Sequence, residues 1–467
     1  MLINGDFERI FYLILPVILG SKRSLLCVLF FAIQLGMKKI NSAKMNLLML
    51  VCVVVGNMMG SGIFMLPANL AAIGSISIFG WFVTLIGILP LALIFAKLAL
   101  VRTRSGGPCV YALDAFGSFI GFQSTYVYWI AAWVGNIGIA VAAIGYLSYF
   151  FPILAYPWFG CLAAIAVIWF FTLINLRGAR TVGSVQIGTT ICMLLPLVFI
   201  VLFGWFWFHP VYFVGAFNVS GKSDLHAISV ASGLTMWSFI GLESALVSAD
   251  SVENPKRNIP LATILGIAIA ALIYIIASSV IIGVVPNSVL AHSNAPFSAA
   301  ISQCLGKWAG WLTSICAMIA CFGTLNGWTL VVTRLSKAAA DNGLFPKLFG
   351  KTNKYNVPAQ GLLIISALIT VVLLFTVSSS INKQFQIIIS TTTVLTLVSY
   401  LYAALASSFL LDKAGLKKSS RYGYNICVAI VSLYIIWTFL GVNLHVLIYG
   451  AIILLSSVFF YFKLKNK

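Results

Sequence analysis

Glu243 is the residue of this chain with the clearest chemical potential. It lies within a long apolar run, beside an interruption at 237–244, whereas the other eight acidic residues fall in predicted loops or at the ends of apolar runs. A charged carboxylate in hydrocarbon costs at least about 2.5 kcal/mol, so such a group is paired, protonated or functional. Glu243 therefore predicts a functional site; a protonated side chain that bonds a neighbouring helix is the structural alternative.

A second interruption is the stretch 57–62, Asn-Met-Met-Gly-Ser-Gly, in the middle of another apolar run. Each glycine costs a helix interior about 1 kcal/mol relative to alanine, and unwound backbone cannot face lipid. The break is expected to line a cavity, and the half-helix that begins near Gly62 directs its positive end at a carboxylate. Broken helices at mid-depth indicate the substrate site of a secondary transporter. A glycine-rich packing face is the alternative.

Four residues of the run 117–147 share one helical face, because they follow the i, i+3, i+4, i+8 pattern: Tyr128, Ala131, Ala132 and Asn136. This face is small and polar on a run that is otherwise bulky. The amide of Asn136 can accept hydrogen bonds from an ammonium or a guanidinium. A helix-packing face held by an interhelical amide bond is the alternative.

Trp237 and Trp328 lie deep in their apolar runs, away from the interfacial belt where tryptophan usually concentrates. Gly323 and Gly327 precede Trp328, so neighbouring backbone can approach it closely. Because an indole face is a good partner for an alkyl chain or a cation, both tryptophans are candidate substrate contacts.

The sequence contains no pattern typical of enzyme or metal chemistry. Its nine cysteines form no C-x-x-C pair, and its four histidines fall in predicted outer loops or at the ends of apolar runs. We therefore predict no catalytic residues, no metal site and no cofactor. A channel is disfavoured because no pore motif is repeated.

The composition is that of a polytopic all-α membrane protein. Of 467 residues, 61% are hydrophobic and only 8% are charged, which no soluble core can absorb. The net charge of +19 does not indicate nucleic acid binding, because the cations sit in short loops between apolar runs. Twelve spans are predicted, near 46–71, 75–100, 117–147, 155–175, 184–208, 227–251, 260–285, 297–333, 358–377, 384–411, 424–442 and 445–462.

The distribution of Lys and Arg predicts that both termini are cytoplasmic. With the N-terminus inside, the inner loops and ends hold 22 cations, and the outer loops hold only Lys222, Lys307 and Lys383. The inner set is Lys38, Lys39, Lys44, Lys97, Arg102, Arg104, Arg177, Arg180, Lys256, Arg257, Arg334, Lys337, Lys347, Lys351, Lys354, Lys413, Lys417, Lys418, Arg421, Lys463, Lys465 and Lys467. One missed span would have inverted every later loop.

The two interruptions fall in spans one and six, each at the start of a block of five spans. This placement predicts an inverted five-plus-five repeat with broken helices 1 and 6. Similarity between the two halves is not visible in the sequence, so the repeat is inferred from position alone.

Residues 1–36 do not belong with the rest of the chain. Their two apolar pieces are shorter than a span, and Asp6, Glu8 and the lack of a small-x-small site argue against a signal peptide. We predict that this extension is dispensable and that 37–467 forms a single transporter domain of twelve spans.

From about Leu47 to the C-terminus, the sequence resembles the bacterial basic amino acid/polyamine antiporters of the amino acid–polyamine–organocation superfamily, and among them most of all the arginine/agmatine antiporters. The motifs that carry the resemblance are 56–62 (GNMMGSG), 67–70 (PANL), 146–152 (YLSYFFP), 203–208 (FGWFWF), 253–260 (ENPKRNIP) and 337–346 (KAAADNGLFP).

The resemblance implies a role for each matching residue. The first break would hold the substrate's α-carboxylate and α-amino groups, Trp237 would act as a near gate, Trp328 would stack on the aliphatic chain as a middle gate, and Asn136 would meet the guanidinium. A far gate toward the cytoplasm would join Tyr128, Glu243 and Tyr400. The implied substrate contacts are Asn57, Gly60, Ser61, Gly62, Ala131, Ala132, Asn136, Ile139, Trp237, Ile240, Trp328 and Thr392.

Four positions depart from the family pattern and bear on selectivity. Ala132 stands where the family exchanger has cysteine, Ile139 where it has methionine, Thr392 where it has serine, and Ser399 where it has proline.

The resemblance implies electrogenic exchange of extracellular arginine for intracellular agmatine by alternating access, in a bacterial inner membrane. Together with a cytoplasmic arginine decarboxylase, this exchange would remove proton equivalents and support acid resistance. The expected partners are the two substrates, the lipid bilayer and a second copy in a homodimer, and no nucleic acid. Lysine/cadaverine and ornithine/putrescine are the alternative substrate pairs.

Overall fold

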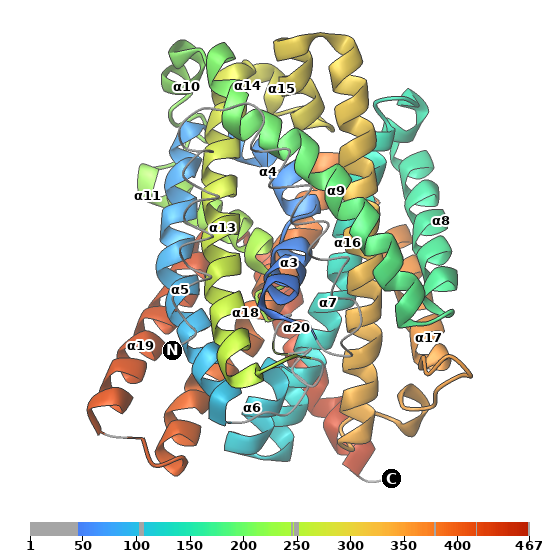
Figure 1. The fold of residues 1–467 in the computed structure, drawn as a ribbon, viewed down its shortest axis with the longest axis vertical. Coiled ribbons are helices and arrows are strands. Elements are labelled where there is room, and N and C mark those ends of the chain that lie inside the picture. The colour runs from blue at the N-terminus through green and yellow to red at the C-terminus, as the bar shows by residue number, and fades with distance from the viewer. Residues whose placement is uncertain are drawn as a thin grey trace, which may run out of the picture.

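A computed structural model describes residues 45–101, 107–243, 246, 252–377, 380–416 and 418–465, with the backbone alone at 179–188, 190 and 191. The predicted extension 1–36 lies outside the described residues. The described chain is a bundle of helices (Figure 1). In order, the helices are α3 (Leu47–Met58), α4 (Ser61–Ala71), α5 (Ile78–Val101), α6 (Pro108–Phe116), α7 (Ser118–Leu147), α8 (Pro157–Asn175), α9 (Ala179–Phe203), α10 (Pro210–Gly215), α11 (Asp224–Met236), α13 (Pro255–Val284), α14 (Asn287–Leu290), α15 (Pro296–Leu305), α16 (Lys307–Asp341), α17 (Ala359–Phe375), α18 (Ile381–Lys413), α19 (Lys418–Gly441) and α20 (Leu444–Lys465).

The helices account for the twelve predicted spans. Within the described ranges, nine segments are long and apolar enough to cross a membrane, the first being α3 and α4 together. Two shorter apolar helices, Cys192–Trp207 and Ala359–Phe375, correspond to predicted spans five and nine, and α11 forms the first half of span six. The protein is therefore an all-α polytopic membrane protein, as its composition predicts.

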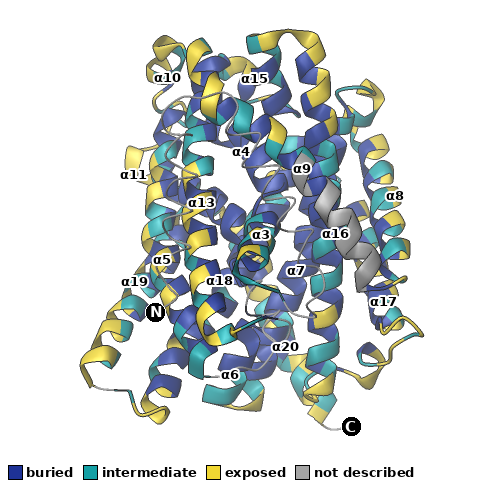
Figure 2. Cartoon of the chain, viewed as in Figure 1, coloured by how far each residue is buried: buried dark blue, intermediate teal, exposed yellow. Residues whose placement is uncertain are grey.

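α7 is the central helix, and almost all of its residues are buried. Its small residues Gly135, Gly138 and Gly145 let α18 approach its backbone closely. By contrast, α19 and α20 expose large apolar side chains such as Leu433 and Leu455. Figure 2 shows this division, with buried residues along the middle and exposed ones on the outer helices. The outward apolar faces are those that lipid covers.

Two short helices of the same construction reveal an internal repeat. α6 begins at Pro108 and is joined to α7 by Gly117 (φ 83°), and α15 begins at Pro296 and is joined to α16 by Gly306 (φ 89°). Both turns need a left-handed residue, which glycine adopts without steric cost. The two short helices lie at opposite ends of the molecule, α6 at the bottom and α15 at the top of Figure 1. The two units thus run in opposite directions across the membrane.

The packing of the long helices follows the same relation. α5 (span two) packs against α11 (span six), and its counterpart α13 (span seven) packs against α3 (span one). In the same way, α7 (span three) packs against α18 (span ten), and its counterpart α16 (span eight) packs against α9 (span five). When spans one to five are matched in order with spans six to ten, each of these contacts maps onto its counterpart. The predicted inverted five-plus-five repeat is therefore confirmed by the packing.

The structure corrects the predicted span at 297–333. Gly306 turns the chain, so α15 ends at Leu305 and the crossing helix α16 runs from Lys307 to Asp341. The prediction merged the two because hydropathy does not register a single left-handed residue.

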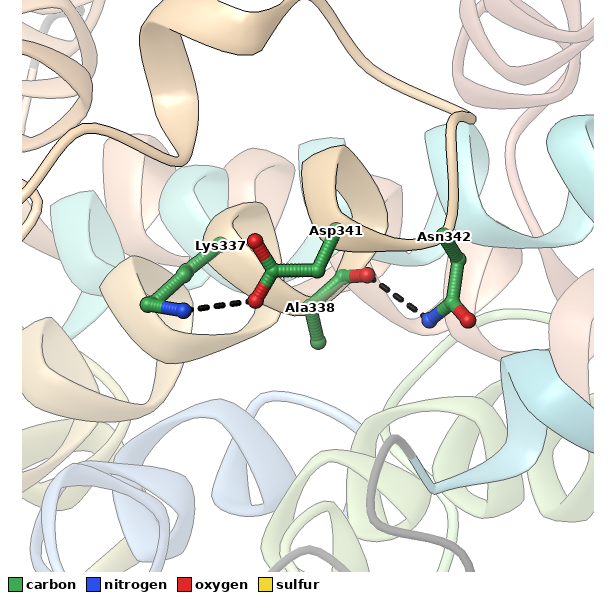
Figure 3. Close-up of polar contacts among 4 residues, drawn as sticks. All are labelled: Lys337, Ala338, Asp341 and Asn342. Atoms are coloured by element: carbon green, nitrogen blue, oxygen red, sulfur yellow. Dashed lines mark hydrogen bonds and ion pairs between the residues drawn. The ribbon is translucent and has the colours of Figure 1, made fainter.

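The motif 337–346 terminates α16. Lys337 Nζ lies 2.6 Å from Asp341 Oδ2, and Asn342 Nδ2 donates to the Ala338 carbonyl over 2.8 Å (Figure 3). Gly343 then adopts φ 72°, which ends the helix. An exposed pair of this kind contributes less than about 1 kcal/mol. The role of this motif is thus to shape the end of a helix.

Predicted inner and outer cations near the ends of α5, α13, α16 and α20 separate to opposite ends of the bundle. Lys97, Lys256, Lys337 and Lys463 lie at the end that carries α6 and the C-terminus, whereas Lys307 lies at the end that carries α15 (Figure 1). We call the first the cation-rich end.

Candidate functional site

The first helix break separates α3 from α4 at Met59 and Gly60. Met59 adopts φ −82° and ψ 121°, and its carbonyl accepts a hydrogen bond from Thr324 Oγ1 of α16 over 3.3 Å. A β-carbon at Gly60 would lie 2.4 Å from the same Thr324 oxygen, so α16 leaves room only for glycine there. The close approach of α16 therefore explains why glycine stands at the break.

The start of α4 offers backbone N–H groups to the interior of the bundle. Its N-cap residue, Gly60, provides no side-chain cap, and Ser61 and Gly62 are buried. The first N–H groups of a helix lack partners within the helix and carry its partial positive charge. This end of α4 is thus suited to bind a carboxylate.

The second break lies in span six and contacts the first. α11 ends at Met236, a single 3-10 turn follows over Trp237–Phe239, and Gly241 adopts φ 114°. A β-carbon at Gly241 would lie 3.1 Å from the Asn57 carbonyl oxygen, so the two unwound segments face each other. Glycine is required at Gly241 both for this approach and for the positive φ.

A narrow cavity lies between the two breaks, α7, α16 and α18. Its lining residues are Asn57, Met58, Gly60, Ser61, Gly62, Tyr128, Ala131, Ala132, Gly135, Asn136, Ile139, Trp237, Ile240, Thr324, Trp328, Thr392 and Thr396. All twelve predicted substrate contacts are in this set. The structure thus brings together residues from five spans.

The two predicted tryptophans lie on the cavity wall. Trp328 Nε1 donates to the Asn57 carbonyl over 3.2 Å, which fixes the indole against the first break. The Trp237 ring packs against α7, where a β-carbon at Gly135 would lie 3.2 Å from it. Both rings are nearly buried. Trp328 thus donates to a backbone carbonyl in the last turn of α3, next to the break.

The predicted far gate is a closed hydrogen-bond cluster on the cation-rich side of the cavity. The hydroxyl of Tyr128 donates to Glu243 Oε1, and that of Tyr400 donates to Glu243 Oε2 over 2.5 Å. The Gly241 N–H donates to the same Oε2 over 3.1 Å. All three side chains are buried. The carboxylate therefore links spans three, six and ten, and Glu243 and Tyr400 lie behind the cavity wall.

Ser399, which departs from the family pattern, adds a contact beside this gate. Its Oγ lies 2.9 Å from Ser124 Oγ, and both side chains are buried. Ser399 thus supplies a polar link between α7 and α18, next to Tyr400, in addition to the hydrogen bond that Tyr402 donates to Gln123.

Comparison with known proteins places this site in a family. The model of the amino acid permease family matches residues 45–462. The chain belongs to this family. The match covers every described element that builds the cavity.

Three relatives of the permease show which branch of the family it resembles. It is 39% identical to a cadaverine/lysine antiporter of Escherichia coli K12 over 368 residues, which cover 78% of this chain and 83% of the relative. It is 34% identical to the putrescine transporter PotE of the same strain over 437 residues, with coverage of 92% and 100%. It is 37% identical to PotE of Haemophilus influenzae over 413 residues, with coverage of 88% and 95%. The predicted membership of the basic amino acid/polyamine antiporters is confirmed, and the permease is a transporter, not an enzyme.

Four lining residues of the permease's cavity were missed by sequence reasoning: Met58, Gly135, Thr324 and Thr396. Thr396 follows Thr392 by four residues, and Thr324 precedes Trp328 by four, so each missed threonine lies one helical turn from a predicted contact. This spacing is the sequence signal that could have identified the two threonines. Nothing in the sequence distinguishes Gly135 from the other glycines of α7.

Substitution of Gly60 tests the break directly. We expect Gly60→Ala to lower the exchange rate by about tenfold or more, because overpacking against Thr324 typically costs about 1–3 kcal/mol and here displaces the start of α4. The rate is measured in proteoliposomes. Gly423→Ala is the control, since a β-carbon there meets nothing within 4 Å. Equal rates for Gly60→Ala and wild type would contradict this account of the break.

Proposed function

We propose that this permease exchanges extracellular arginine for intracellular agmatine by alternating access. The observation that carries the proposal is the cavity lined both by the helix N-terminus at Ser61 and Gly62 and by polar side chains of α7 and α18. A basic amino acid fits this arrangement with its α-carboxylate at the start of α4. Its aliphatic chain then lies along Trp328, and its cation reaches Asn136 and Thr392.

In this proposal, the gates open alternately. The far gate of Tyr128, Glu243 and Tyr400 is closed in the structure, which blocks the route to the cation-rich end. Binding energy that is realised in only one of two conformations can shift the balance between them. Substrate that contacts Trp328 and Trp237 together therefore biases the two halves of the bundle toward closure on one side and opening on the other.

The charge balance of the exchange follows from the chemistry of the two substrates. Agmatine lacks the carboxylate, so it carries one more positive charge out than arginine carries in. Each cycle is electrogenic, and with an arginine decarboxylase in the cytoplasm it removes one proton equivalent. We place the protein in a bacterial inner membrane with both termini in the cytoplasm, in keeping with its charge distribution.

The relatives favour a second candidate pair. Their names state lysine with cadaverine in one case and putrescine in the others. The same cavity geometry accepts lysine/cadaverine or ornithine/putrescine, because an ammonium group also donates to amide and hydroxyl oxygens.

Counterflow in proteoliposomes separates these candidates. Vesicles loaded with agmatine should take up labelled arginine, and a negative-inside potential should change the rate, since net charge moves in each cycle. Unlabelled lysine, ornithine, cadaverine and putrescine are then compared as competitors. Uptake that is equal in loaded and empty vesicles would rule out exchange, and stronger competition by lysine or ornithine than by arginine would select the second pair.

The predicted domain boundary gives a separate test. A chain that begins at Met37 is expected to insert and to exchange at the wild-type rate, because residues 1–36 fall outside the predicted spans and precede the family match, which starts at residue 45. Insertion is checked by membrane fractionation and exchange by the same counterflow assay. Loss of exchange in an inserted truncated chain would assign the extension a role.

A further inference from the structure

Thr396 is a polar cavity residue to which the proposed function gives no role. Its side chain is 1% exposed, and its hydroxyl has no hydrogen-bond partner within the described part of the chain. Two other threonines near the site, by contrast, are satisfied by their own helix: Thr324 donates to the Ala320 carbonyl over 3.0 Å, and Thr329 to the Leu325 carbonyl over 2.7 Å. Because an unpaired buried hydroxyl is unfavourable, a ligand is expected to complete it.

The register of two helices places Thr396 beyond the predicted substrate contacts. Thr396 and Tyr400 are one turn apart on α18, and Ala132 and Tyr128 are one turn apart on α7, which runs in the opposite direction. The Tyr128 and Tyr400 rings lie 6.4 Å apart. Thr396 and Ala132 are therefore opposite each other, one turn above the far gate, and both line the cavity.

We propose that Thr396 sets the chain length of substrate that the cavity prefers. Its hydroxyl accepts a hydrogen bond from the distal guanidinium of the longer substrates, arginine and agmatine. This inference rests on the proposed function, in which the α-carboxylate lies at the start of α4. Thr396 lies about 6 Å further along α18 than Thr392, toward the cation-rich end. The guanidinium of arginine ends two bonds beyond the ammonium position of ornithine and carries its N–H donors in a planar fork, so it can donate toward Thr396 as well as toward Thr392.

The cation of a shorter substrate stops at the level of Thr392, one helical turn before Thr396. There, Asn136 Oδ1 and Thr392 Oγ1 also lack partners among the described residues and can accept from the ammonium of ornithine or putrescine. The cavity thus has two successive acceptor levels, and only the longer cations reach the second.

The variant Thr396→Val tests this proposal, because it removes the acceptor and keeps the volume. We expect the apparent affinity for arginine to fall by about tenfold, as for the loss of one hydrogen bond to a charged group. The affinity for ornithine should stay within about twofold of wild type, since its contacts are unchanged. Thr396→Ser restores the hydroxyl and should recover the preference for longer substrates.

Thr393→Val is the matched control. Thr393 is the same residue type on the same helix, is fully buried and has a hydroxyl without a partner in the described structure, but it does not line the cavity. It should leave all affinities unchanged. Thr396→Ala gives the same readout if the valine variant fails to insert.

Two outcomes overturn the inference and one concerns the function instead. Wild-type affinities in Thr396→Val, or an equal loss for ornithine and arginine, would remove Thr396 from the recognition of chain length. Failure of the wild-type protein to exchange any of these substrates would contradict the proposed function itself.

Discussion

Trp328→Leu is expected to abolish exchange while the protein still folds and inserts. In the structure, the indole lines the cavity and donates to the Asn57 carbonyl at the first helix break. Leucine removes the flat aromatic face along which the aliphatic chain of the substrate is proposed to lie. It also removes the hydrogen bond, worth about 1 kcal/mol, that holds the first break against α16. The substrate thus loses its stacking partner and the break loses a support.

The same helix offers a control for Trp328. Trp311 lies on the outer face of α16 and is 59% exposed, so Trp311→Leu should exchange at the wild-type rate. Both variants are reconstituted at equal protein content, and labelled arginine counterflow and thermal stability are measured for each. Normal exchange in a folded Trp328→Leu protein would exclude this side chain from the site.

Glu243→Gln is expected to flatten the dependence of exchange on pH. In the closed far gate, the carboxylate accepts from Tyr128 and Tyr400 at once. Protonation gives one oxygen a hydrogen and so removes one acceptor, which weakens the closed arrangement by about 1.5–3 kcal/mol, the worth of a charge-assisted hydrogen bond. Wild-type exchange should therefore rise as the pH falls, because the gate opens more easily when the group is protonated.

Glutamine mimics the protonated state at every pH. Its amide has one acceptor oxygen and one donor group, so one phenol must turn away. Glu243→Gln should retain substrate binding, since Glu243 lies behind the cavity wall. The measurement is the turnover of arginine against pH in proteoliposomes. Asp341→Asn, at the exposed end of α16, is the control. An identical pH profile for wild type and Glu243→Gln would eliminate the proposed role.

The sequence alone was sufficient for the architecture of the membrane domain. Hydropathy and the distribution of cations predicted twelve spans, and glycine and serine at mid-depth predicted the breaks in spans one and six. These are local properties: a run of apolar residues or a glycine pair has the same meaning wherever it packs. The same holds for the isolation of Glu243, which is visible because charged residues are rare in such runs.

The candidate site was predicted largely through the family resemblance, which named twelve cavity residues correctly as a set. Helical period alone grouped Tyr128, Ala132 and Asn136 on one face, but it left helix packing open as the reason. The same period connects Thr396, but not Thr393, to the expected contact Thr392, yet only the neighbouring helices decide which face of α18 turns toward the cavity.

The tertiary structure decided the contacts between distant residues. Glu243 meets tyrosines that are 115 and 157 residues away in sequence, and Gly60 is a glycine because Thr324 of α16 fills the space where a β-carbon would lie. The turn at Gly306 also emerged only in three dimensions, where its counterpart Gly117 shows the repeat. Such features depend on which helices pack together, and the free energy of that packing is spread over many small contacts that no single stretch of sequence contains.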